Sequence, residues 1–116
     1  MVVDSVFQNE LTDDEVNRIF RALADATRRD ILRRTLVGEV TVSNLAADYD
    51  MSFAAVQKHV AVLEGAGLVT KLPSGRERLV RANPDTISKA QALLAHFERL
   101  WTSRINRLDE LFAEDS

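Results

Sequence analysis

The side chains that could carry out chemistry in this chain of 116 residues are few. The sequence has no cysteine, which excludes disulfides, thiolate nucleophiles, redox switches and thiolate metal sites. Its two histidines, His59 and His96, are too few for a histidine-rich metal cluster within one chain. Ser52 shares a predicted helix with His59, but no acidic residue at a suitable spacing orients this histidine, and no glycine-rich phosphate loop occurs. The sequence therefore predicts a protein that is not an enzyme and has no metal or other cofactor.

Basic residues are concentrated in the middle of the chain. Residues 1–17 hold five acids and no base, residues 18–81 hold eleven bases and seven acids, and residues 82–116 hold four bases and six acids. The net charge of −3 argues against a nucleic-acid-binding protein, since such domains often have an isoelectric point above about 9. The basic middle argues for one. Charge alone leaves the question open, because ordinary scatter of surface charge gives a similar pattern.

Caps and apolar spacing predict one mainly α-helical domain with a small β-hairpin over residues 1–116. The length suits one domain, since most domains have about 100–150 residues. Thr12, Asp25, Thr41 and Ser52 are typical N-cap residues, and Glu15 completes a capping box with Thr12. Helices are predicted at residues 13–24, 26–36, 42–48, 53–65 and 84–112, and a hairpin at 68–82 that turns at 73–75. No segment resembles a signal peptide or a membrane span, so a cytoplasmic location is expected.

Residues 42–82 have the pattern of a winged helix-turn-helix, in which two helices joined by a tight corner are followed by a basic hairpin. In this motif the second helix enters the major groove of DNA and the first helix braces it. Four apolar residues of the second helix share a face that is predicted to be buried: Phe53, Val56, Val60 and Leu63. Small, polar and basic residues lie on the opposite face: Ala54, Gln57, Lys58 and Ala61. Three arginines mark the hairpin tip and its second strand: Arg76, Arg78 and Arg81. The segment therefore predicts a DNA-binding protein, with the hairpin arginines at the DNA backbone or the minor groove.

The last predicted helix presents more apolar surface than a domain of this size covers by itself. Eight apolar residues recur at spacings of three and four, so they lie on one face: Ile87, Ala90, Leu94, Phe97, Trp101, Ile105, Leu108 and Phe112. We expect a second copy of the chain to cover this face.

Three motifs occur in the order found in a known family of bacterial regulators. They are the run LADATRRDIL at residues 23–32, the run SFAAVQKHVAVL at 52–63 with its exit AGLV at 66–69, and GRER at 75–78. They resemble the second helix, the recognition helix and the wing tip of the ArsR-type repressors. The resemblance spans residues 13–112 approximately. It implies a homodimeric winged helix-turn-helix repressor that binds double-stranded DNA and pairs through its first and last helices.

The resemblance also implies which residues act. The DNA contacts of the second helix of the motif and of the wing would be Ser52, Ala54, Ala55, Gln57, Lys58, His59, Arg76 and Arg78. Arg28 matches an arginine of the family whose role is either structural or directed at a phosphate, and His59 is equally suited to packing and to a phosphate contact. The dimer interface would comprise Val16, Ile19, Phe20, Ile87, Ala90, Leu94, Phe97, Trp101, Ile105 and Leu108.

The sequence departs from the family at both of its common metal sites. The third helix has no cysteine, and Asp85 on the last helix is followed two residues later by Ile87 rather than by histidine. His96 and Glu98 do not restore the spacing. Regulation by a transition metal is therefore not expected.

Two other functions remain open for this sequence. One is a winged-helix regulator that an organic effector releases from DNA, with the effector bound between the long helices. The other is a winged helix used for protein–protein contact with little affinity for DNA, which the acidic net charge favours. Affinity for a DNA duplex that falls as salt rises would exclude the protein–protein function. Release from DNA by an organic effector would identify the effector-controlled regulator.

Overall fold

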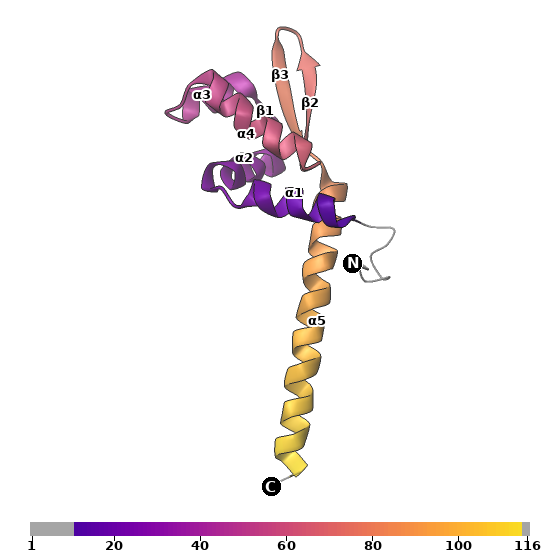
Figure 1. The fold of residues 1–116 in the computed structure, drawn as a ribbon. Coiled ribbons are helices and arrows are strands. Elements are labelled where there is room, and N and C mark those ends of the chain that lie inside the picture. The colour runs from indigo at the N-terminus through magenta and orange to yellow at the C-terminus, as the bar shows by residue number, and fades with distance from the viewer. Residues whose placement is uncertain (1–10, 115–116) are drawn as a thin grey trace.

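Most of the chain is helical, and a small antiparallel sheet completes it (Figure 1). The computed structural model describes residues 11–114. The helices are α1 (Asp13–Leu23), α2 (Ala26–Val37), α3 (Val42–Asp48), α4 (Phe53–Gly65) and α5 (Pro84–Glu114). The strands are β1 (Val40–Thr41), β2 (Val69–Ser74) and β3 (Glu77–Ala82), in the order β1-β3-β2. The predicted fold class, five helices with a wing, is confirmed; the predicted domain of residues 1–116 extends beyond the described residues at both ends.

Each of the first four helices begins at its predicted cap. The Thr12 hydroxyl accepts a hydrogen bond from the backbone N–H of Glu15 at 3.1 Å, and the Glu15 carboxylate accepts from the N–H of Thr12 at 3.2 Å. Asp25, Thr41 and Ser52 accept in the same way from the N–H three residues ahead. These side chains satisfy N–H groups that the first turn of a helix leaves without a partner.

The sheet differs from the predicted hairpin in two respects. A third strand, β1, pairs with β3 through Val40 opposite Val80 and Thr41 opposite Leu79, and it was not predicted because it is two residues long. The turn consists of Gly75 and Arg76 rather than residues 73–75, since Ser74 pairs with Glu77. Gly75 has φ 63°, a left-handed conformation that glycine adopts without steric cost in a two-residue hairpin turn.

The core lies between α1–α4 and the sheet, and it fixes the orientation of α4. Val56, Val60 and Leu63 of α4 are fully buried, against α2, α3 and β2. The prediction that Phe53 shares this buried face is wrong, because its side chain is 47% exposed. Phe53 is the first residue of α4, one turn ahead of Val56, where the buried part of the helix begins.

Helix α5 leaves the body of the protein after its first two turns and gives the molecule extents of 68 × 29 × 22 Å (Figure 1). Ile87 and Ala90 still pack against the core. From residue 97 to residue 113 every side chain is exposed. None of the helices in the described part of the chain combines the length and the apolar composition that crossing a bilayer requires.

Candidate nucleic-acid interface

Helix α4 presents a small, polar face to solvent, as the sequence predicts. Ala54, Gln57, Lys58 and Ala61 are exposed on this face, opposite the buried valines and leucine. Ala55 is half-buried, and the Ser52 hydroxyl caps the helix by accepting from the Ala55 N–H at 3.1 Å. Contacts with α2, α3 and β2 hold the other side of α4, so the fold fixes the orientation of this exposed face.

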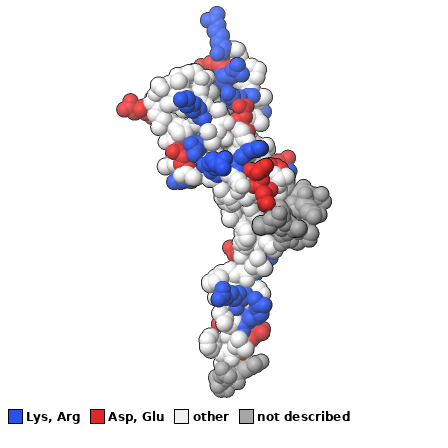
Figure 2. Space-filling model, in the orientation of Figure 1, with Lys and Arg blue, Asp and Glu red and all other residues white. Residues whose placement is uncertain are grey.

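The wing places arginines at the end of the molecule next to α4. Arg76 follows Gly75 at the tip of the β2–β3 hairpin, and Arg78 lies two residues along β3; both side chains are exposed. Figure 2 shows basic side chains at the hairpin tip and over the helices beside it. The α4 surface and the wing together form a candidate surface for a polyanion.

Three cations of this region have no ion pair with any of the residues that the structure describes: Lys58, Arg76 and Arg78. Four other basic side chains, on α2, β2 and β3, form ion pairs. Their partners lie at 2.6–3.8 Å in the pairs Arg33–Asp30, Arg34–Asp48, Arg81–Glu39 and Lys71–Glu64. Lys58, Arg76 and Arg78 are therefore the cations of this surface whose charge is available to phosphates.

Arg34 of α2 braces the helix-turn-helix from the side of α3. Arg34 donates to the Asp48 carboxylate at 2.6 Å and lies 5.5 Å from the centre of the Tyr49 ring, which ties α2 to the end of α3. The Tyr49 hydroxyl donates to the Asp30 carboxylate, and this bond together with Arg33 holds the pKa of Asp30 below its usual value. Burial, with the Asp30 carboxylate beside it, raises the pKa of Tyr49.

Arg28 and His59 form contacts inside the protomer. The Arg28 guanidinium donates to the carbonyls of Ala22 at 2.8 Å and Arg21 at 3.0 Å, which closes the C-terminal end of α1. His59 is 22% exposed, and its Nδ1 lies 3.5 Å from the Arg28 Nη1 and 3.8 Å from the Asp25 Oδ2. The hydrogen bonds of Arg28 to these backbone carbonyls favour the structural one of its two predicted roles, and its DNA contact stays a prediction. The contacts of His59 favour packing over a phosphate contact.

Replacing Arg28 with alanine should lower stability without removing a phosphate contact. Hydrogen bonds to a charged donor contribute about 1.5–3 kcal/mol to stability, and two backbone carbonyls lose theirs. We expect a lower free energy of unfolding and weaker DNA binding, with an unchanged slope of log affinity against log salt. Urea denaturation and DNA titration at several salt concentrations measure both quantities. A slope that falls by about 0.9 per protomer would instead identify a phosphate contact of Arg28.

The predicted dimer residues separate into two groups. Ile19 is 1% exposed in the core of its own protomer, and Val16, Ile87 and Ala90 are half-buried against that core. Their place in an interface stays a prediction. The others are exposed by 36–60%: Phe20, Leu94, Phe97, Trp101, Ile105 and Leu108. Two further leucines of α5, Leu100 and Leu111, are exposed and were not predicted to lie in the interface, because they flank the apolar stripe rather than lying at its centre. A wider apolar arc on the helix would have included them.

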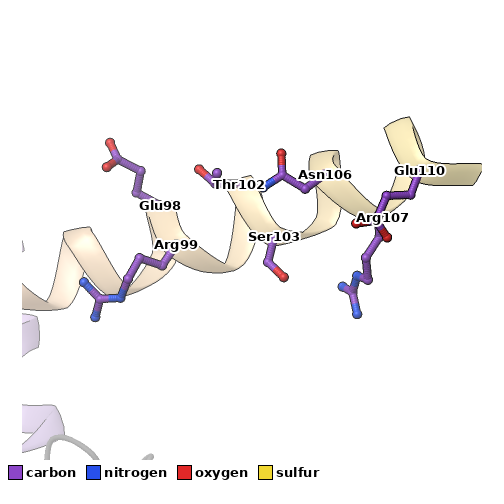
Figure 3. A pocket seen from close by; sticks show the side chains of 7 residues that line it. All are labelled: Glu98, Arg99, Thr102, Ser103, Asn106, Arg107 and Glu110. Atoms are coloured by element: carbon purple, nitrogen blue, oxygen red, sulfur yellow. The ribbon is translucent and has the colours of Figure 1, made fainter. Parts of the chain in front are cut away.

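The polar side of α5 carries a shallow depression (Figure 3). Its lining residues all come from this one helix: Glu98, Arg99, Thr102, Ser103, Asn106, Arg107 and Glu110. The aromatic residues Phe97 and Trp101 of the apolar stripe are not among them. Within residues 11–114, no three acidic or histidine side chains come together as ligands for a metal ion.

Comparison with known proteins agrees with this geometry. A family model described as a helix-turn-helix domain matches residues 23–71. The HTH-type transcriptional regulator Rv2034 of Mycobacterium tuberculosis is 36% identical over 95 residues, which is 82% of this chain and 86% of that protein. An ArsR-like transcriptional regulator from Rhodococcus sp. RHA1 has a TM-score of 0.73 at 30% identity, over 84% of this chain and 92% of the other.

The oligomeric state of one relative is known from a more distantly related structure. The homodimeric winged helix-turn-helix DNA-binding domain Mb0332 of Mycobacterium bovis has a TM-score of 0.61 at 26% identity, over 78% of this chain and 91% of that one. These relatives are regulators of transcription and not enzymes. The motifs, the fold and the similarity over most of the chain show that this protein belongs to the ArsR family of winged helix-turn-helix transcriptional regulators.

Proposed function

We propose that this regulator is a homodimeric repressor that binds an inverted-repeat operator through α4 and the wing. The observation that carries the proposal is the exposed polar face of α4 beside three cations without ion pairs in the described chain, Lys58, Arg76 and Arg78. An α-helix fits the major groove, about 12 Å wide, when small residues allow close approach. Ala54 and Ala61 supply that clearance, and Gln57 and Lys58 supply hydrogen bonds to bases.

The residues divide by role within this proposal. Direct DNA contacts come from Ser52, Ala54, Ala55, Gln57, Lys58, Arg76 and Arg78. Arg28 of α2 and His59 of α4, whose Nη1 and Nδ1 atoms lie 3.5 Å apart, connect these two helices within the protomer. A regulator of this kind represses by occupying its operator, which prevents RNA polymerase from using the same DNA.

The proposed dimer rests on α5. Its exposed apolar stripe from Leu94 to Phe112 is not covered by any of residues 11–114, and exposed apolar patches of this extent mark interaction sites. The relative Mb0332 is homodimeric, and a two-fold dimer is the commonest soluble oligomer. The second copy would cover the stripe together with Phe20 of α1, which is 42% exposed.

Selection of bound duplexes from a random pool, followed by footprinting, tests the proposal. Two identical α4 helices related by a two-fold axis should select an imperfect inverted repeat whose half-site centres lie about 10 bp apart, or a multiple of this spacing. Both half-sites should be protected together. Protection of one asymmetric half-site by a monomer, or the absence of any selected duplex, would contradict the proposal.

A further inference from the structure

An aromatic side chain stands exposed at the start of α4. Phe53 is 47% exposed, and it is absent from the set of residues that pack against the core, to which Val56 and Val60 of the same helix belong. Met51, two residues earlier, is 38% exposed. The entry to α4 therefore presents apolar surface that contributes little to the fold.

This apolar surface adjoins the proposed DNA-contacting face. Phe53 and Gln57 are four residues apart, so they are neighbours on the helix surface, and Ala54 beside them is exposed. The residues at the N-terminal end of the second helix of a helix-turn-helix are those that reach base edges. Phe53 occupies this end, next to the Ser52 cap.

The chemistry of a phenyl ring restricts what it can recognise in the major groove. Most groups at base edges there are hydrogen-bond donors or acceptors, and a ring pressed against one leaves it unsatisfied. The apolar exception is the C5-methyl group of thymine, with which phenylalanine makes favourable contact. We propose that Phe53 is a specificity-determining residue that recognises the C5-methyl group of one thymine in each half-site. The inference rests on the proposed function, since it requires α4 to lie in the major groove.

Replacing each operator thymine in turn with deoxyuridine tests the proposed contact between Phe53 and a thymine methyl group, because deoxyuridine lacks only the C5-methyl group. Burying one methyl group corresponds to about fourfold in affinity, so one position per half-site should show a loss of about fourfold. Replacement in both half-sites should cost about fifteenfold. Phe53→Ala should bind the thymine and uracil duplexes equally, and Phe53→Leu should retain part of the difference.

Val62→Ala is the matched control, since Val62 is 39% exposed on the same helix but towards its other end. Val62→Ala should lose as much affinity on uracil replacement as the unaltered protein does. Circular dichroism establishes that each variant is folded. The scan with the unaltered protein shows whether any thymine methyl group is contacted, and Phe53→Leu tests whether Phe53 makes the contact if Phe53→Ala does not fold.

Two outcomes would overturn the inference. One is operator binding that no uracil replacement weakens. The other is a loss on uracil replacement that persists in Phe53→Ala, which would assign the methyl contact to another residue such as Ala54. Both outcomes leave operator binding intact and therefore leave the proposed function standing. Failure to bind any selected duplex would instead overturn the proposed function itself.

Discussion

Phe97→Asp should convert the protein from a dimer to a monomer at micromolar concentration. Phe97 is 56% exposed in the protomer and lies within the apolar stripe of α5. A charge buried there without a partner is strongly unfavourable, and a two-fold interface contains it twice. Trp101→Ala acts on the same stripe, where loss of an aromatic anchor costs about 2 kcal/mol or more per copy. The two copies together correspond to roughly a thousandfold weaker dimerisation.

Analytical ultracentrifugation measures the dimerisation of these variants, and their affinity for DNA should weaken in parallel. Ser103→Asp is the matched control, because it adds the same charge on the polar side of α5, where Ser103 lines the depression of Figure 3. This control variant should remain dimeric. Wild-type protein that sediments as a monomer at micromolar concentration, or a Phe97→Asp variant that stays dimeric, would contradict the interface.

Gln57→Ala and Arg76→Ala should weaken DNA binding in two different ways. Gln57 lies on the rigid, exposed face of α4, so its loss should cost about 1–3 kcal/mol per half-site on the operator and little on random DNA. Arg76 lies at a hairpin tip without an ion pair in the described chain, so we expect it to bind the DNA backbone or the minor groove. Its loss should weaken operator and random DNA alike and flatten the salt slope by up to about two per dimer.

Titration of operator and scrambled duplexes at two or more salt concentrations separates the two effects. Lys58→Ala can follow either pattern, since lysine contacts both phosphates and guanine. Arg33→Ala is the control for loss of charge, because its guanidinium is paired with Asp30 at 2.7 Å, and it should leave the salt slope unchanged. Equal weakening of both duplexes by Gln57→Ala would show that α4 is not the helix that recognises bases.

Local signals in the sequence predicted most of the fold. Caps such as Thr12 and Ser52 act on the next three residues, so they mark helix starts without knowledge of the tertiary structure. Strand β1 escaped detection because two residues carry no periodicity and the pairing of Val40 with Val80 spans about a third of the sequence. Pro73 was assigned to the turn, yet it lies in the edge strand β2, where its missing N–H is tolerated.

The candidate site was predictable where it depends on helix faces and not where it depends on tertiary contacts. Spacing alone placed Gln57 and Lys58 on the exposed face of α4. Spacing could not show that Arg28 reaches the carbonyls at the end of α1, because that contact depends on how two helices meet. Helical spacing also placed Phe53 in the core, although its side chain is exposed, because a helical period says nothing about where along the helix the core begins.

The ratio of affinities for the selected operator and for a scrambled duplex of the same length and composition measures base recognition by α4 most directly. Base recognition by two α4 helices predicts operator binding at least about 10³-fold tighter at physiological salt, with both affinities falling as salt rises. Equal affinities for the two duplexes, or no measurable binding to either, would show that α4 does not recognise bases.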